Sequence, residues 1–127
     1  MNKIYNPATM HPGIGYSHGI ELTPGARVIC TSGQVGVDAD GVLAESFEDQ
    51  ADQVFRNILT VLSDAGMGRE DIIKLNVFMT RREDLPAYGP ILERHLGDHL
   101  PTDTLVLVSG LAREACRIEI DCWAAKS

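Results

Sequence analysis

The sequence predicts a single α+β domain in which two helices cover one face of a mixed β-sheet. Its 127 residues are close to the commonest domain size, and a composition of 44% hydrophobic and 23% charged residues leaves no biased tract that would stay disordered. One segment has the apolar spacing of a helix, and several others are rich in Val, Ile and Leu, as strands are. No internal repeat divides the chain, so residues 1–127 are expected to form one domain with the order β-β-α-β-α-β-β.

The expected strands are apolar segments separated by turn residues. Pro24 and Gly25 fit the centre of a type II turn between the first two strands, because Pro fixes the first dihedral angle and Gly accepts the positive second one. The strands are expected at Tyr16 to Glu21, Arg27 to Val35, Ile72 to Thr80, Asp103 to Ser109 and Ala115 to Ala124.

The segment Phe47 to Ala65 is expected to be the first helix, because its apolar residues recur at helical spacing and so form one stripe. Ser46 precedes it in the position of an N-cap, and Asp49 follows where a capping box has its acidic residue. Gly66 is placed to end the last turn. The stripe predicts that this helix packs on one face of the sheet.

A second helix is expected from Leu85 to Leu96, with Asp84 as its candidate cap. Pro90 conflicts with this helix, because a proline beyond the first turn removes a backbone hydrogen bond. The helix is therefore expected to start late or to be kinked.

Two of the strand segments indicate that the second face of the sheet is also buried. Leu105 to Val108 and Val28 to Cys30 are apolar at every position, whereas a strand with one buried face buries only alternate residues. The helices cover one face, so other copies of the chain are expected to cover the other in a closed homo-oligomer. In the last strand Ile118 and Ile120 should point to the helices, which places Glu119 at the contact between subunits.

The charge of the chain excludes several classes of partner. The 18 acidic and 11 basic side chains give a net charge of −7, which repels phosphate backbones, and Arg81 and Arg82 are the only adjacent basic pair. Nucleic acid is therefore not an expected partner. No apolar run approaches the roughly 20 residues that span a membrane, and no signal-peptide core is present, so a cytoplasmic protein without a membrane contact is expected.

No metal or cofactor is expected. Cys30, Cys116 and Cys122 are an odd set without Cys-x-x-Cys spacing, so buried free thiols are expected rather than disulfides or zinc ligands. His95 and His99 have the spacing of one helix face, but the glycine between them predicts a fraying helix end rather than a metal site. No glycine cluster has the full spacing of a phosphate-binding loop, so no nucleotide is expected.

Several motifs along the chain resemble those of one family. They are Gly15-Tyr16-Ser17, Thr31-Ser32-Gly33-Gln34, Gln50 to Asn57, Ile73 to Phe78, Pro101 before a strand, and Ile118-Glu119-Ile120 near the end. In this order they resemble the Rid family, the reactive intermediate deaminases also called YjgF-like or RidA-like proteins, over nearly the whole chain. The resemblance implies a chorismate-mutase-like α+β fold and a homotrimer with clefts between neighbouring subunits. It also implies hydrolysis of short-lived enamines and imines with release of ammonia.

The resemblance also assigns residues to the substrate-binding cleft. Those that match the family pattern are Tyr16, Ser32, Gly33 and Glu119. Gly89 stands where the deaminases usually have asparagine, and Leu105 where they often have cysteine. Asp103 stands where the deaminases have an arginine that holds the substrate carboxylate by two parallel hydrogen bonds. The chain therefore resembles a branch that lacks the substrate-binding arginine, and we expect little activity on ordinary 2-imino acids.

Glu119 and Asp103 are the expected catalytic residues. Glu119 could accept a proton from water at an interfacial cleft, or it could be only a hydrogen-bond partner in the interface. Asp103 could form a two-carboxylate set with Glu119, bind a cationic ligand, or form an ion pair between subunits. The expected function is a deaminase-type hydrolase that acts on an enamine-like or imine-like small metabolite. The alternative is a trimer that binds a small metabolite without catalysis, and the acidic charge disfavours a ribonuclease.

Overall fold

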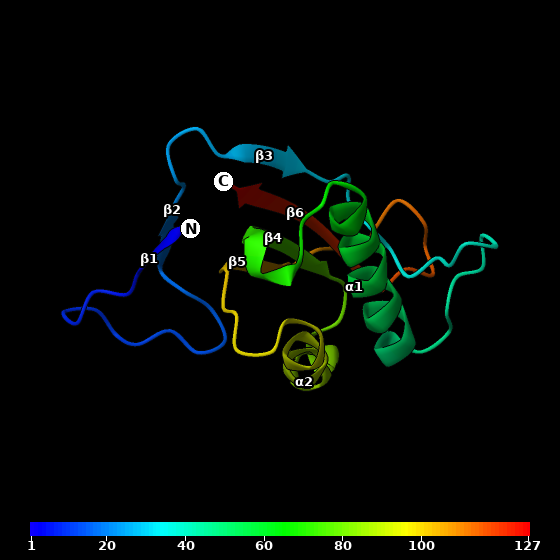
Figure 1. The fold of residues 1–127 in the computed structure, drawn as a ribbon. Coiled ribbons are helices and arrows are strands. Elements are labelled where there is room, and N and C mark those ends of the chain that lie inside the picture. The colour runs from blue at the N-terminus through cyan, green and yellow to red at the C-terminus, as the bar shows by residue number, and fades with distance from the viewer.

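The computed structural model describes residues 1–127 and has the α+β fold that the sequence predicts (Figure 1). The helices are α1 (Phe47–Asp64) and α2 (Leu85–Leu96), with short 3₁₀ turns at Arg69–Asp71 and Arg82–Asp84. The strands are β1 (Lys3–Tyr5), β2 (Gly19–Glu21), β3 (Arg27–Cys30), β4 (Ile72–Met79), β5 (Thr102–Leu107) and β6 (Ile118–Lys126). Neither α-helix combines the length and the apolar character needed to cross a membrane.

The main sheet is mixed and has the strand order β3-β6-β4-β5. β4 and β5 run parallel, whereas β6 runs antiparallel to both β3 and β4. β1 and β2 form a separate antiparallel pair, so the expectation of a single sheet in the order β-β-α-β-α-β-β is wrong in that detail. β1 was not predicted because it is only 3 residues long and all of them are exposed, so no alternation of apolar and polar side chains marks it.

β2 and β3 are shorter than expected. β2 begins at Gly19 rather than at Tyr16, and β3 ends at Cys30 rather than at Val35. An isolated bridge between Gln34 and Ile120 keeps the segment after β3 beside β6. The segments before β2 and after β3 that were expected as strand form loops instead, and they carry the predicted site residues Tyr16, Ser32 and Gly33.

The helix α1 forms as the sequence predicts. Ser46 Oγ accepts a hydrogen bond from the backbone N–H of Asp49 at 3.0 Å, which caps the first turn. Its apolar stripe is buried in the core, with Phe55 and Ile58 at the centre and Ala65 partly buried at the end. Gly66 follows the last turn with a φ of 72°, the left-handed conformation that favours glycine.

The helix α2 has the predicted bounds, but neither the predicted cap nor the expected late start is found. The Asp84 side chain does not cap the helix, because its two carboxylate oxygens accept hydrogen bonds from the guanidinium of Arg117. The helix does not start late, since Pro86 lies in the first turn, where a backbone N–H has no helical partner to lose. It continues through Pro90 to its end. Arg117 is thereby held by its own chain.

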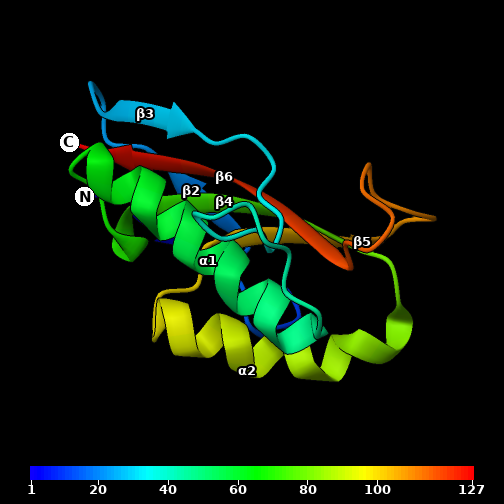
Figure 2. The same cartoon turned by 90° about the vertical axis from the view of Figure 1, so that its right-hand side faces the viewer.

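Both helices pack on the same face of the main sheet, and the hydrophobic core lies between them and the sheet (Figure 2). Alternate residues of β4 and β6 are completely buried there, among them Leu75, Val77, Ile118 and Ile120. The predicted orientation of the last strand is therefore confirmed. Glu119, which lies between two of these residues in β6, points to the opposite face.

The opposite, open face of the sheet leaves large apolar side chains in contact with solvent. Val28, Val106 and Trp123 are 43%, 42% and 44% exposed. They come from β3, β5 and β6, so they are spread across the sheet. Exposed apolar side chains on one sheet face are typical of a surface that binds another protein chain.

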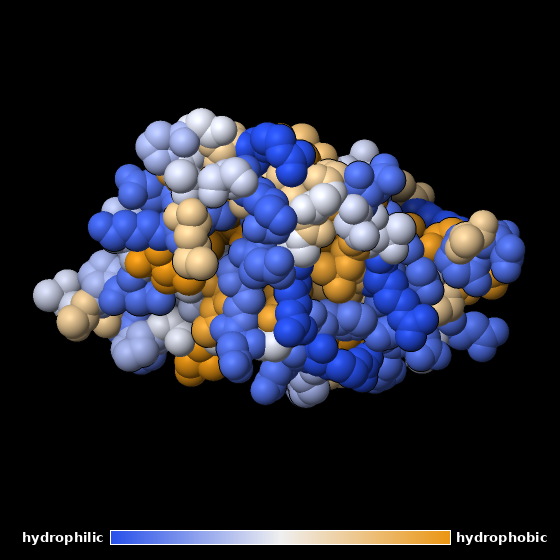
Figure 3. Space-filling model, in the orientation of Figure 1, coloured by the Kyte–Doolittle hydropathy of each residue, from blue (hydrophilic) through white to orange (hydrophobic).

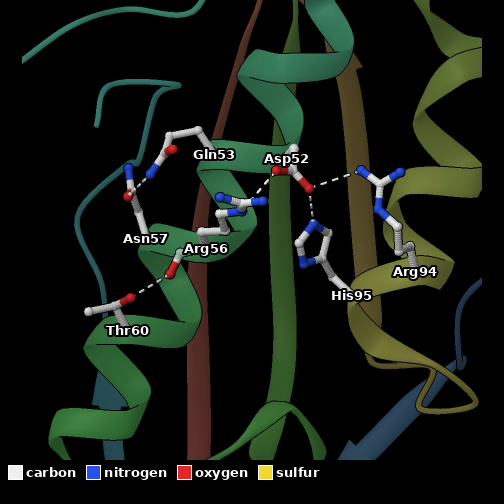
Figure 4. A network of polar contacts seen from close by, with 7 residues as sticks. All are labelled: Asp52, Gln53, Arg56, Asn57, Thr60, Arg94 and His95. Atoms are coloured by element: carbon white, nitrogen blue, oxygen red, sulfur yellow. Dashed lines mark hydrogen bonds and ion pairs between the residues drawn. The ribbon is translucent and has the colours of Figure 1, made fainter. Parts of the chain in front are cut away.

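A polar network joins α1 to α2 around Asp52 (Figure 4). The Asp52 carboxylate is hydrogen-bonded to Arg94 at 2.9 Å and to His95 at 2.7 Å, both on α2, and forms an ion pair with Arg56 at 2.9 Å. Burial acts to raise the pKa of Asp52, but the hydrogen bonds and the basic charges outweigh it, so the pKa of this carboxyl is lowered. His95 therefore serves the contact between the helices.

Candidate functional site

The structure divides the predicted site residues between the two faces of the main sheet. The parallel pairing of β5 with β4 sets Asp103 beside Leu75, which is fully buried on the helix side. The antiparallel pairing of β6 with β4 sets Glu119 beside Phe78, on the open face. Within one chain, therefore, Asp103 and Glu119 do not form a two-carboxylate set.

A cleft of about 760 Å³ lies on the helix side, between α2, the loop before β2 and the start of β5. The predicted site residues that line it are Tyr16, Gly89, Asp103 and Leu105. The loop is attached to the start of β5 because the backbone N–H of Ser17 donates to the carbonyl oxygen of Pro101 at 3.1 Å. Figure 3 shows hydrophobic surface at the lower left, where Figure 1 shows this loop approaching α2.

The apolar part of the cleft comes mainly from α2 and β5. Leu85, Leu92, Leu96 and Leu105 line it. Gly89 lies among them on α2, and a Cβ added at this glycine would meet no atom within 4 Å. The missing side chain therefore leaves free space in the cleft, at the position where the resemblance implies an asparagine.

Two buried polar atoms near the cleft have no hydrogen-bond partner: Asp103 Oδ1 and the hydroxyl oxygen of Tyr88. Burial raises the pKa of Asp103 to about 6, although the charge of Lys74 acts in the opposite direction. Burial, and after it the negative charge of Asp103, raises the pKa of Tyr88 well above its usual value. Because buried polar atoms are nearly always hydrogen-bonded in folded proteins, this end of the cleft is incomplete within the chain.

The side chains that line the cleft include acids but no lysine or arginine. The acidic ones are Glu93, Asp98 and Asp103. His99 also lines the cleft, and its Nε2 is hydrogen-bonded to the carbonyl oxygen of Ile72 at 2.7 Å. A ligand in the cleft therefore meets carboxylates and no basic side chain that could hold a carboxylate by a paired hydrogen bond.

The remaining predicted site residues lie together on the open face. Reciprocal backbone hydrogen bonds between Gln34 and Ile120, at 2.8 and 3.0 Å, hold the loop after β3 along β6. This brings Gly33 so close to Glu119 that an added Cβ would lie 2.2 Å from Glu119 Oε2. Ser32 is exposed beside it, and Glu119 is partly buried. Glu119 and the Ser32–Gly33 backbone thus form a second group, separate from the cleft.

Among the polar side chains that line the cleft, those of Tyr88, Glu93 and Asp98 were not predicted from the sequence. Tyr88 falls on the apolar stripe of α2 with Ile91 and Leu92, so its spacing indicated only core packing. A signal was nevertheless present, because a tyrosine in a buried stripe has a hydroxyl group that needs a partner. Glu93 and Asp98 gave no signal, since charged residues near a helix end usually face solvent.

No group of three or more His, Cys, Asp or Glu side chains is arranged to hold a metal ion. Cys116 and Cys122 are buried free thiols, as expected, but Cys30 is exposed. The expectation is wrong for Cys30 because β3 is an edge strand and Cys30 pairs with Trp123, whose side chain lies on the open face.

Comparisons with known proteins identify the family. The family model described as Endoribonuclease L-PSP matches residues 7–126. A RutC family protein of Aquifex aeolicus is 30% identical over 129 residues, which cover 99% of this chain and 100% of the relative. A 2-iminobutanoate/2-iminopropanoate deaminase of Dermatophagoides farinae is 26% identical over 120 residues, which cover 93% of this chain and 91% of the relative.

A solved structure gives the same result for the fold. The crystal structure of the Rid-family protein YyfB of Yersinia pestis superposes with a TM-score of 0.89 at 29% identity, over 98% of each chain. Since the family model spans nearly all of the sequence, the chain belongs to the Endoribonuclease L-PSP family, which is the Rid or YjgF-like family predicted from its motifs.

Proposed function

We propose that this protein is a deaminase-type hydrolase that acts on an enamine-like or imine-like small metabolite in clefts between the subunits of a homotrimer. Membership of the Rid family and the name of one relative, 2-iminobutanoate/2-iminopropanoate deaminase, support the reaction type. The observation that carries the proposal is the separation of the predicted site residues onto the two faces of the sheet. That separation is the arrangement expected of a site shared between copies.

A neighbouring copy would complete the site. Asp103 lies in the cleft beside α2 and Glu119 lies on the open face, so the two groups meet when the open face of one copy covers the cleft of the next. The exposed side chain of Trp123 on the open face favours such a contact. A contact between two different surfaces is heterologous, and it closes into a ring when the rotation allows, as a trimer does.

Hydrolysis of an imine makes modest demands on the protein. The imine carbon is already electrophilic, so a positioned water adds to it when a base accepts one of the water protons. In the proposal the Glu119 carboxylate accepts this proton and returns it to the imine nitrogen, which gives a carbinolamine. The hydroxyl proton then passes to the nitrogen, the C–N bond breaks, and ammonia leaves a carbonyl product. The Ser32–Gly33 backbone, beside Glu119, is suited to hold the water or the product.

Asp103 is expected to exclude substrates that carry a carboxylate. A substrate carboxylate in the cleft would meet acidic side chains and no lysine or arginine, and an unpaired buried charge is unfavourable. Arg117 does not supply the missing cation, since Asp84 holds its guanidinium. Ordinary 2-imino acids are therefore not the proposed substrates. The family description names a ribonuclease, but a net charge of −7 disfavours RNA as a substrate.

Ammonia release from two imines of similar size tests the proposal. One is the 2-imino acid made in place from a small amino acid, and the other is a carboxylate-free imine made from a small amine. We expect the wild-type protein to accelerate ammonia release from the carboxylate-free imine only. Asp103→Arg should improve use of the 2-imino acid roughly tenfold to a hundredfold, because a charge-assisted hydrogen bond contributes about 1.5–3 kcal/mol.

Two further variants serve as controls. Glu119→Gln should abolish the acceleration, and Asp40→Asn should leave it unchanged, because Asp40 is an exposed acid outside both groups of site residues. Rapid wild-type hydrolysis of the 2-imino acid would contradict the role given to Asp103. No acceleration with either imine would contradict the hydrolase and favour the trimer that binds without catalysis.

A further inference from the structure

We propose that the cleft beside α2 binds a small organic cation with N–H donors, such as an ammonium, amidinium or guanidinium group. Asp103 is the acceptor for this group, and the Tyr88 hydroxyl is its second polar contact. The inference rests on the proposed function, because it names the class of ligand for the same site. Binding is nevertheless measured without catalysis, so the two proposals fail independently.

The unpaired polar atoms of the cleft define what the ligand must offer. Asp103 Oδ1 and the Tyr88 hydroxyl are both buried without a partner, so they are not hydrogen-bonded to each other, and Tyr88 is only 5% exposed. An ionised carboxylate oxygen only accepts hydrogen bonds, whereas a phenol hydroxyl both donates and accepts. A head group with several N–H donors satisfies both atoms at once. An anionic head group would pair with Tyr88 and leave Asp103 unpaired.

The distribution of charge also favours a cation. Glu93 on α2 and Asp98 in the loop after α2 add their negative charges to that of Asp103, and no lysine or arginine lines the cleft. Lys74 is the base whose charge acts on Asp103, but its Nζ donates to Thr104 Oγ1 at 2.6 Å, on the open face of the sheet. The charge of Asp103 is therefore not neutralised by a contact within the chain.

The apolar lining favours an organic cation over a metal ion. Leu92, Leu96 and Leu105 face the cleft with Asp103, which suits a ligand with a short aliphatic body. A metal ion such as Ca²⁺ requires several oxygen ligands, and no group of three or more His, Cys, Asp or Glu side chains is arranged to hold one. The volume of about 760 Å³ lies within the range of small-molecule sites, which is about 300–1,000 Å³.

Isothermal titration calorimetry with matched probes tests the ligand class. The probes are butylammonium, butyramidinium and butylguanidinium as cations, with butyrate and 1-butanol as the anionic and neutral counterparts of the same chain length. We expect the best of the cations to bind to the wild-type protein at least about tenfold more tightly than butyrate or 1-butanol, because only the cations offer charge-assisted hydrogen bonds to Asp103.

Three variants assign the binding to particular atoms. Asp103→Asn keeps the size of the side chain and removes its charge, and it should weaken cation binding about tenfold or more. Tyr88→Phe removes only the hydroxyl and should weaken it about threefold. Asp40→Asn removes one exposed acidic charge away from the cleft and should change nothing, which controls for nonspecific attraction to an acidic protein.

Equal affinity for butylammonium and butyrate would overturn the inference, as would equal cation affinity in the wild-type protein and in Asp103→Asn. The first comparison needs only the wild-type protein, so it remains decisive if a variant does not fold. If a basic side chain from a neighbouring copy already pairs with Asp103, none of the cationic probes will bind. That result would also overturn the inference. Cation binding without ammonia release would reject the hydrolase alone, and ammonia release without cation selectivity would reject the ligand class alone.

Discussion

Two aspartates beside α2 have opposite surroundings. Asp52 on α1 is hydrogen-bonded to Arg94 and His95, and its pKa is lowered. Asp103 on β5 has a buried oxygen without any partner, lies near the unpaired hydroxyl of Tyr88, and has a pKa raised to about 6. The contact between the helices is therefore complete within the chain, whereas the cleft is not. This difference indicates that Asp103 has a partner outside its own chain, and we propose that the partner is a cationic ligand.

The largest effect on stability is expected for Asp103→Leu, which removes the unpaired charge. It should raise the free energy of unfolding by about 1–3 kcal/mol above pH 7. The pKa of Asp103 rises from 3.8 to about 6 on folding. The wild-type protein therefore loses stability as the pH rises from 3.8 to about 6, because the buried carboxylate becomes ionised. Below pH 3.8 this destabilisation is absent. Urea unfolding of Asp103→Leu and of the wild-type protein, below pH 3.8 and above pH 7, measures the difference in the free energy of unfolding. A loss of stability above pH 7 would mean that Asp103 is already paired.

Local patterns allowed much of the fold to be predicted from the sequence. The apolar stripe from Phe47 to Ala65 marked α1, and the alternation around Ile118 and Ile120 correctly oriented β6. The side of the sheet on which Asp103 lies could not be predicted in this way, because the segment from Leu105 to Val108 is apolar at every position and shows no alternation. Its orientation depends on the pairing of Asp103 with Leu75, which is a contact between distant parts of the chain.

The candidate site was predicted only in part, because it too depends on contacts between distant parts of the chain. The motifs pointed to Tyr16 and Glu119, but only the structure shows that these residues belong to different groups. Tyr88 was not predicted as a site residue, because burial and spacing alone do not separate a tyrosine with a paired hydroxyl from one without. Hydrogen-bond partners come from tertiary structure, and local sequence patterns do not contain them.

Asp52→Asn is expected to act in the opposite direction from Asp103→Leu. It should lower the free energy of unfolding by about 1–2 kcal/mol near pH 7, because it weakens charge-assisted hydrogen bonds to Arg94 and His95. The folded pKa of Asp52 lies below its usual value of 3.8, so its stabilisation is present above 3.8 and is lost as the pH falls through the folded pKa. Urea unfolding near pH 7 measures the free energy of unfolding of Asp52→Asn and of the control variant Asp40→Asn. If both variants are equally stable, the network does not contribute to stability.

Gly89→Ala is expected to have the smallest effect. It should raise the melting temperature by an amount that corresponds to about 0.5–1 kcal/mol, because alanine favours a helix and the added Cβ meets no atom within 4 Å. Thermal unfolding with circular dichroism measures the change. A lower melting temperature would mean that a neighbouring copy packs against this glycine and that the space is not free in the assembled protein.

The pKa of Asp103, measured by NMR of its carboxyl carbon with and without butylammonium, decides whether this carboxylate binds an added cation. The other titratable groups around Asp103 are Tyr16, Tyr88, Glu93, Asp98, His99 and Lys74. We predict a pKa of about 6 in the protein alone, and a fall of about one unit or more when butylammonium saturates the cleft, because a bound cation favours the ionised carboxylate. A pKa that butylammonium does not change, or one already below 3.8 in the protein alone, would rule out Asp103 as the acceptor for a cationic ligand.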